Sequence, residues 1–232
     1  VASTEITALL ADEAANRVAI EDQDINVDSG TISVDVANSL DLTTDGTITA
    51  DITTSETVTE LKTLTGTHAY TIVIAGGDAT SSSADDLNTI NGKTTEAVSL
   101  ANVTALTSSS LSDLETLATA IGDNEFSNAT GLTTIAVSDT TIEADALAAR
   151  IDSFDEINGE NKTTGMTLVS EATINVASTE ITALLADESA NRVAIEDQDI
   201  NVDSGTISVD VANNLDLTTD GTITADITTS ET

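Results

Sequence analysis

Residues 1–30 read VASTEITALLADEAANRVAIEDQDINVDSG, and residues 176–205 repeat this stretch with one substitution. The match extends from residues 1–57 to residues 176–232. Two substitutions separate the copies, Ala14 to Ser189 and Ser39 to Asn214. Because the offset is 175 residues, residues 1–175 are one full long repeat, and the remainder is the start of the next copy. Such near-identity predicts a window on a longer tandem array; the alternative is a single duplicated segment.

The composition is strongly acidic. The 232 residues include 41 Asp and Glu against 6 Lys and Arg, a formal charge of −35, with no Pro, Cys or Trp and 1% aromatic residues. The lack of Cys excludes disulfides and Cys-based zinc sites, and the few cations predict no nucleic-acid partner. No apolar run reaches the roughly 18 residues of a membrane span. Evenly spread Ile, Val and Leu argue against disorder, and they predict a thin core with little room for aromatic rings.

Shorter units recur inside the period, and each joins a helix-like stretch, a polar turn and a strand-like stretch. In residues 84–100, ADDLNTINGKTTEAVSL, Leu87 and Ile90 are three apart and therefore share one helical face. Ser83 is placed to cap this helix, and Asn91-Gly92 is expected to end it in the left-handed conformation. About six such units, spaced by roughly 22 to 35 residues, fit into one period.

A tandem one-helix, one-strand unit predicts an α/β fold, an elongated solenoid of short helix–strand repeats with parallel stacked strands. The absence of Pro favours this stacking, because Pro would remove a donor from the strand ladder. Residues 22–36 depart from the plain unit and predict an extra hairpin or added pair of strands, with Ser29-Gly30 as the turn. The alternative architecture is an array of all-β domains, about two in each period.

Catalytic chemistry has little support. His68 is the one imidazole in the chain, so a catalytic triad would have to be built around it; we expect a surface or turn histidine instead. Carboxylates occur throughout, but aromatic platforms for binding sugar are almost absent, which argues against a glycosidase. We therefore predict that the chain is not an enzyme, and we assign no catalytic residue.

Calcium binding is the sharpest chemical hypothesis. Oxygen-bearing side chains alternate along one stretch of each copy, ahead of Gly30 and Gly205, and a hard cation needs six to eight oxygen ligands. The candidate ligands are Asp22, Asp24 and Asp28 in the first copy and Asp197, Asp199 and Asp203 in the second, with Asn26 and Asn201 between them. An EF-hand would need an acidic twelfth residue where Ser33 stands. The alternative is a strand with one acidic, solvated face and one apolar face.

The charge density itself predicts partners. Residues 1–175 hold 29 acidic and 5 basic residues, a net charge of −24. If six coils stack about 4.8 Å apart, one charge falls on roughly every 1.2 Å, which is comparable to duplex DNA. We therefore expect divalent cations as partners, and the tandem array predicts further copies of the same repeat as partners in a filament.

Three segments carry a resemblance: ADDLNTINGKTTEAV (residues 84–98), LDLTTDGTITADI (residues 40–52) and INGENKTTGMTLV (residues 157–169). They resemble the Thr/Asp/Ala-rich tandem-repeat regions of very large secreted and cell-surface proteins of cyanobacteria and other marine bacteria. The resemblance is compositional and covers most of the chain. It implies an extracellular or cell-surface location and a structural or adhesive role, and it implies no catalytic residues.

The repeats and the resemblance together predict a structural segment of an extracellular filament, sheath or surface-layer fibre. No cofactor is expected to be required. The alternative is a calcium-stiffened adhesin stalk, which would hold a distant binding domain away from the cell.

Overall fold

The chain is a mixed α/β protein with parallel sheets. The computed structural model describes residues 1–159 and 164–228, so residues 160–163 of the sixth predicted unit lie outside the described part. The chain forms two compact units. Unit 1 comprises Val1–Val103 and Thr119–Gly131, and unit 2 comprises Thr104–Ala118 and Leu132–Thr232. Helix α5 (Leu111–Gly122) begins in unit 2 and ends in unit 1.

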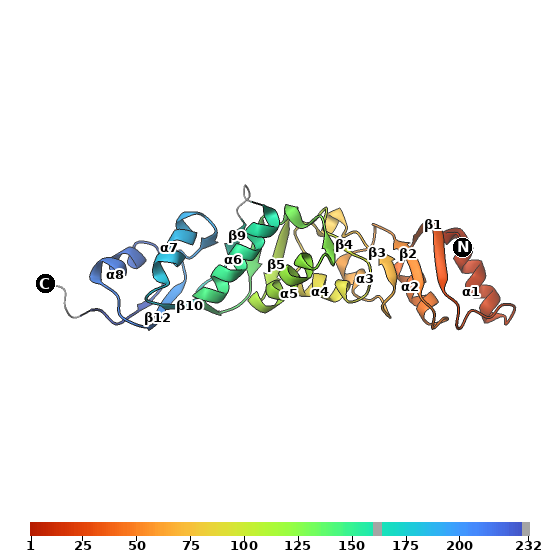
Figure 1. The fold of residues 1–232 in the computed structure, drawn as a ribbon, viewed down its shortest axis with the longest axis horizontal. Coiled ribbons are helices and arrows are strands. Elements are labelled where there is room, and N and C mark those ends of the chain that lie inside the picture. Colours follow the sequence, from red (N-terminus) through yellow and green to blue (C-terminus); the bar gives the residue numbers. More distant parts are fainter. Residues whose placement is uncertain (160–163, 229–232) are drawn as a thin grey trace. The chain divides into compact units, whose positions relative to one another are not determined.

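Helices and short strands follow one another along the chain (Figure 1): single strands separate the α-helices as far as α4, and two or three strands separate them farther on. Unit 1 contains η1 Ser3–Glu5, α1 Ile6–Ala14, β1 Ile25–Ile32, α2 Val34–Asp41, β2 Ile48–Ile52, α3 Val58–Leu61, β3 Ala69–Thr71, η2 Gly76–Asp78, α4 Ala84–Asn91, β4 Val98–Ser99, β6 Phe126–Ser127 and η3 Ala129–Gly131. Unit 2 contains β5 Ala105–Ser109, β7 Thr134–Val137, β8 Thr141–Glu143, α6 Ala144–Asn158, β9 Gly165–Thr167, β10 Thr173–Ala177, α7 Ile181–Ser189, β11 Val193–Ala194, β12 Asp199–Ser204, α8 Val209–Asp216 and β13 Ile223–Thr224.

Strands from successive segments pair in parallel. In unit 1 the sheets have the orders β1-β2-β3 and β4-β6, and in unit 2 they have the orders β5-β7-β9-β11 and β8-β10-β12-β13. Paired residues lie 20 positions apart at the closest, Thr49 with Ala69, and 32 at the widest, Thr141 with Thr173. The predicted α/β class with parallel strands is therefore confirmed, and the helices contradict the alternative of all-β domains.

The helix predicted after Ser83 is α4. Leu87 and Ile90 are fully buried on one face. The Ser83 Oγ accepts a hydrogen bond from the Asp86 N–H at 3.1 Å, and Asp86 Oδ2 accepts one from the Ser83 N–H at 3.2 Å. This reciprocal capping box fixes the start of the helix. Its predicted left-handed ending is wrong, because Gly92 has a right-handed φ of −64°.

The hairpin predicted in residues 22–36 is also wrong, because β1 runs through this stretch as a single strand. It pairs in parallel with β2 on both sides of an irregularity, Ile25 with Ile48 and Ile32 with Ile52. Gly30 lies inside the irregularity with φ +79°, a conformation that favours glycine. The Ser29-Gly30 pair therefore marks a bulge in a parallel strand and not a reversal of the chain.

Ile, Val, Leu and Ala make up most of the buried core. All three phenyl and phenol rings nevertheless lie inside it: Tyr70, Phe126 and Phe154 are at most 4% exposed. The expectation of little room for rings is therefore wrong at these three places. The Tyr70 hydroxyl is buried and has no hydrogen-bond partner among the described residues, and its burial raises the pKa of the phenol.

Candidate functional site

A threonine and a glycine join successive segments at the turn that follows α2. The Thr44 hydroxyl is buried; it donates to the Gln23 carbonyl at 2.7 Å and accepts from the Gly46 N–H at 2.9 Å. Asp24 Oδ1 accepts from the Thr47 N–H at 2.8 Å. The second copy repeats all three bonds at Thr219, Gly221 and Asp199, with distances of 2.6, 2.9 and 2.7 Å. We call this arrangement the Thr–Gly joint.

The joint gives two of the predicted calcium ligands a structural role, since Asp24 and Asp199 each tie one segment to the next. The other candidates in the first copy lie apart from it. Asp22 is exposed in a turn, and Asp28 Oδ2 lies 3.5 Å from the amino group of Val1. In β1, Ile25 and Val27 are buried while Asp28 is exposed, so the strand has the apolar face and the acidic face that we considered as the alternative.

In the second copy, part of the predicted set gathers around one hollow. Asp197 and Asp199 line a cavity of about 470 Å³ together with Glu171 and Asp220, whereas Asp203 is an exposed residue farther along β12. Asp197 Oδ2 accepts a hydrogen bond from the Ser170 hydroxyl at 2.9 Å. Across residues 1–159 and 164–228, no three Asp, Glu or His side chains are close enough together to hold a metal ion.

His68 is not the surface or turn residue that we expected. It is 8% exposed, and its ring is held at both nitrogens. Nδ1 accepts a hydrogen bond from the Ile48 N–H at 3.2 Å, so the proton is on Nε2, which donates to Asp41 Oδ1 at 2.7 Å. Burial would raise the pKa of Asp41, but the hydrogen bonds from His68 and Thr65 outweigh it and hold this pKa below its usual range.

A lowered carboxyl pKa predicts how stability depends on pH. The Asp41 carboxylate stabilises the fold above its unfolded pKa, and the contribution is lost as the pH falls through the lowered native pKa. Asp41→Asn should therefore cost roughly 1 kcal/mol of unfolding free energy at pH 7. The difference between the variant and the parent chain should shrink as the pH is taken below 4 in urea titrations.

The second copy supplies the control for this experiment. Asp216 occupies the position of Asp41 in α8 but is exposed. Asp216→Asn should have little effect at any pH. If Asp41→Asn and Asp216→Asn behaved alike, the His68 bond would not be the source of the effect.

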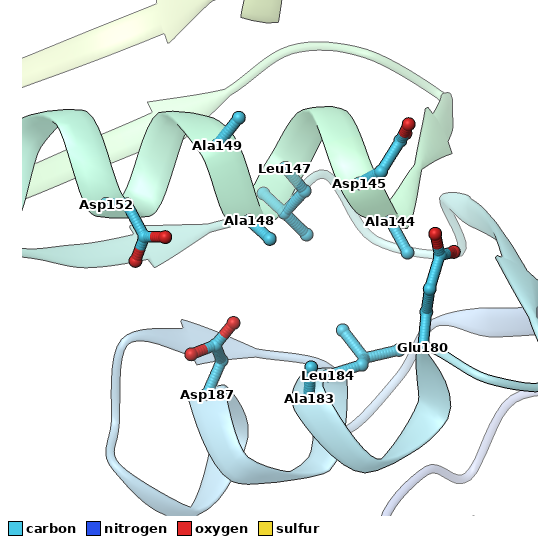
Figure 2. Close-up of a pocket in the computed structure, with 10 residues that line it drawn as sticks. All are labelled: Ala144, Asp145, Leu147, Ala148, Ala149, Asp152, Glu180, Ala183, Leu184 and Asp187. Carbon is cyan, nitrogen blue, oxygen red and sulfur yellow. The ribbon is translucent and has the colours of Figure 1, made fainter.

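A groove runs between α6 and α7 in unit 2 (Figure 2). Its volume is about 370 Å³. Leucine and alanine side chains form its apolar part, and carboxylates stand along it. Figure 2 shows Asp152 of α6 and Asp187 of α7 pointing toward one another across the groove. The lining residues are Ala144, Asp145, Leu147, Ala148, Ala149, Asp152, Glu180, Ala183, Leu184 and Asp187.

Arg192 binds carboxylates from both of the helices that form this groove. Its Nε donates to Asp155 Oδ2 at 2.8 Å, its Nη1 donates to Asp187 Oδ1 at 2.6 Å, and its Nη2 bonds Asp152. Partial burial alone would lower the pKa of Arg192, but the bonds to Asp152 and Asp155 and the charge of Asp187 raise it. The two facing carboxylates of the groove are therefore both hydrogen-bonded to one guanidinium, whose single positive charge offsets part of their negative charge.

Sequence reasoning missed both the Arg192 cluster and the Thr–Gly joint. A signal for the joint was present, because the turn sequence TTDG occurs in both copies, at residues 43–46 and 218–221. The arginine cluster had a weaker signal. Asp187 precedes Arg192 by five residues, but nothing in the sequence connects Arg192 to Asp152 and Asp155 on α6.

Comparisons with protein-family models, with curated proteins and with solved structures found no match for this chain. Among the described residues, no helix combines the length and the apolar character that crossing a membrane would require.

Proposed function

We propose that the chain is a structural, non-catalytic segment of an extracellular filament, sheath or surface-layer fibre, built as an elongated α/β solenoid. One observation carries the proposal: within each unit, strands of successive segments pair in parallel. Each segment thereby supplies backbone partners to the next, which is how solenoids extend through nearest-neighbour contacts. The near-identity of residues 1–57 and 176–232 supports the same proposal, because a filament built by repetition needs nearly identical segments at a fixed period.

The charge fits a filament that stays solvated outside the cell. A net charge of −35 keeps copies apart through repulsion and is relieved by salt or divalent cations. The buried positions are mainly apolar, so the charge lies on the outside of the coils. Imaging of the native material tests the proposal. Continuous filaments of uniform width are the expected result, whereas short stalks that end in a knob would contradict it.

The second candidate is the calcium-stiffened adhesin stalk. The hollow lined by Glu171, Asp197, Asp199 and Asp220 favours it, because carboxylates that line one cavity attract divalent cations, although no three of these described side chains are close enough to hold an ion jointly. Calcium drawn to this hollow would offset the repulsion between the carboxylates and so stiffen the stalk.

The calcium stalk makes a sharp prediction for calorimetry. Millimolar Ca²⁺ should raise the melting temperature relative to EDTA, and Mg²⁺ at the same ionic strength should raise it less. Asp197→Asn combined with Asp199→Asn should remove the difference between the two ions. Asp203→Asn is the matched control and should preserve it. Equal increases of the melting temperature in Ca²⁺ and Mg²⁺ would contradict a specific calcium site and would indicate diffuse screening of the charged surface.

A further inference from the structure

The two copies of residues 1–57 place nearly the same sequence in two different surroundings. In the second copy, α7 and β11 pack against segments that precede them in the period, namely α6 and β9. The corresponding residues of the first copy have no such neighbour in unit 1. A comparison of equivalent positions therefore shows which side chains a preceding segment covers.

Four positions change their exposure in the same direction. Val18 is 37% exposed while its equivalent Val193 is 3% exposed, and the side chain of Arg17 is 68% exposed while that of Arg192 is 23% exposed. Leu9 is half-buried and Gln23 is exposed, whereas the equivalent Leu184 and Gln198 are buried. We call Leu9, Arg17, Val18 and Gln23 the leading face.

The charges of the leading face follow the same pattern. Arg17 bonds Asp12, the equivalent of Asp187. Arg192 makes that bond and two more, to Asp152 and Asp155 of α6. A guanidinium that presents several donors is suited to bridge carboxylates of two helices. Arg17 therefore has donors that, in the equivalent surroundings, are filled by α6.

We infer that the leading face is a docking surface for another copy of residues 144–175, with the α6 sequence lying over Leu9 and Arg17 and the β9 sequence pairing beside Val18. The inference rests on the proposed repeat architecture and deepens it, because it names the residues at which one period would contact the next. The occupant is defined by what covers the same sequence in the second copy: an apolar helix face with carboxylates at the positions of Asp152 and Asp155, followed by a strand.

The test joins a copy of residues 144–175 in front of Val1 of the full chain, in the order in which Asn175 precedes Val176. Amide exchange of residues 17–19 should slow by at least about tenfold, toward the rate of residues 192–194 in the same molecule. A control chain carries residues 58–89 instead, which are equal in length and also form a helix–strand unit. This control should leave residues 17–19 unprotected.

Arginine variants give a second readout that does not depend on exchange. In the unextended chain, Arg192→Ala should lower the melting temperature by roughly 3 °C, and Arg17→Ala should lower it much less. In the extended chain the two variants should lower it equally. Changing the added residues equivalent to Asp152 and Asp155 to Asn should restore the difference.

Unchanged exchange of residues 17–19 in the extended chain, with the rest of unit 1 protected as before, would overturn the inference. A dimer of the unextended chain that Arg17→Ala dissociates would also overturn it, because the occupant would then be a second whole chain. Neither result concerns the native material, so a failed docking test and a failed filament image would be distinguishable.

Discussion

Gly46→Ala is expected to lower the free energy of unfolding by roughly 3 kcal/mol or more. The Thr–Gly joint brings Gly46 against the backbone of the preceding segment. A Cβ at this position would lie 2.3 Å from the Gln23 carbonyl oxygen and 2.8 Å from the Asp24 nitrogen. These atoms belong to the backbone and cannot rotate away, so the two segments must separate or the joint must break. Urea denaturation followed by circular dichroism measures the loss.

Gly76→Ala is the matched control for Gly46→Ala. Gly76 begins η2 at a right-handed φ, and a Cβ there would meet no atom within 4 Å. The substitution should be neutral or stabilise the chain by up to about 1 kcal/mol. A Gly46→Ala variant as stable as Gly76→Ala would show that the two segments are not in close contact at the joint.

Leu87→Ala is expected to cost about 2 to 5 kcal/mol, because it removes a fully buried side chain from a well-packed core. Leu87 lies on the buried face of α4 together with Ile90 and Ala84. A helix of this length does not persist without tertiary contacts, so amide protection within α4 should fall together with the stability. Hydrogen exchange of α4 and chemical denaturation measure both effects.

Leu42→Ala is the matched control for Leu87→Ala, because it truncates the same type of side chain at an exposed position. Leu42 follows α2 and is 87% exposed. Its truncation should change stability by no more than about 0.5 kcal/mol. If both leucine variants lowered the free energy of unfolding equally, burial of the residues that periodicity assigned to the core would not be what stabilises the fold.

Two successful predictions rest on local signals in α4, although the local signal for a left-handed ending at Gly92 failed. The spacing of Leu87 and Ile90 indicated which helix face is buried, and Ser83 indicated where the helix begins. Both signals depend on contacts within a few residues of one another. The parallel pairing of strands followed from the tandem order of helix and strand, because a strand, a crossover helix and a second strand produce parallel neighbours.

The other errors arise where a distant segment decides the local structure. Gly30 resembled the glycine of a hairpin turn, yet β2 holds both ends of the same strand in parallel register. His68 carried no local sign of burial; its environment is set by Asp41 and the Ile48 amide, which lie 27 and 20 residues away in the sequence. The Arg192 cluster is a third case, since its carboxylates on α6 precede it by 37 and 40 residues.

The central proposal is that the chain is a solenoid, which lengthens in one direction as segments are added. Scattering from chains of increasing length tests this proposal most directly. Small-angle X-ray scattering would compare the present chain with chains lengthened by one, two and three periods of 175 residues. A solenoid predicts equal increments of maximum dimension, each at least roughly 29 Å for six stacked strands. A radius of gyration that instead rises only as about the 0.38 power of chain length would indicate compact packing of the added residues and would contradict the proposal.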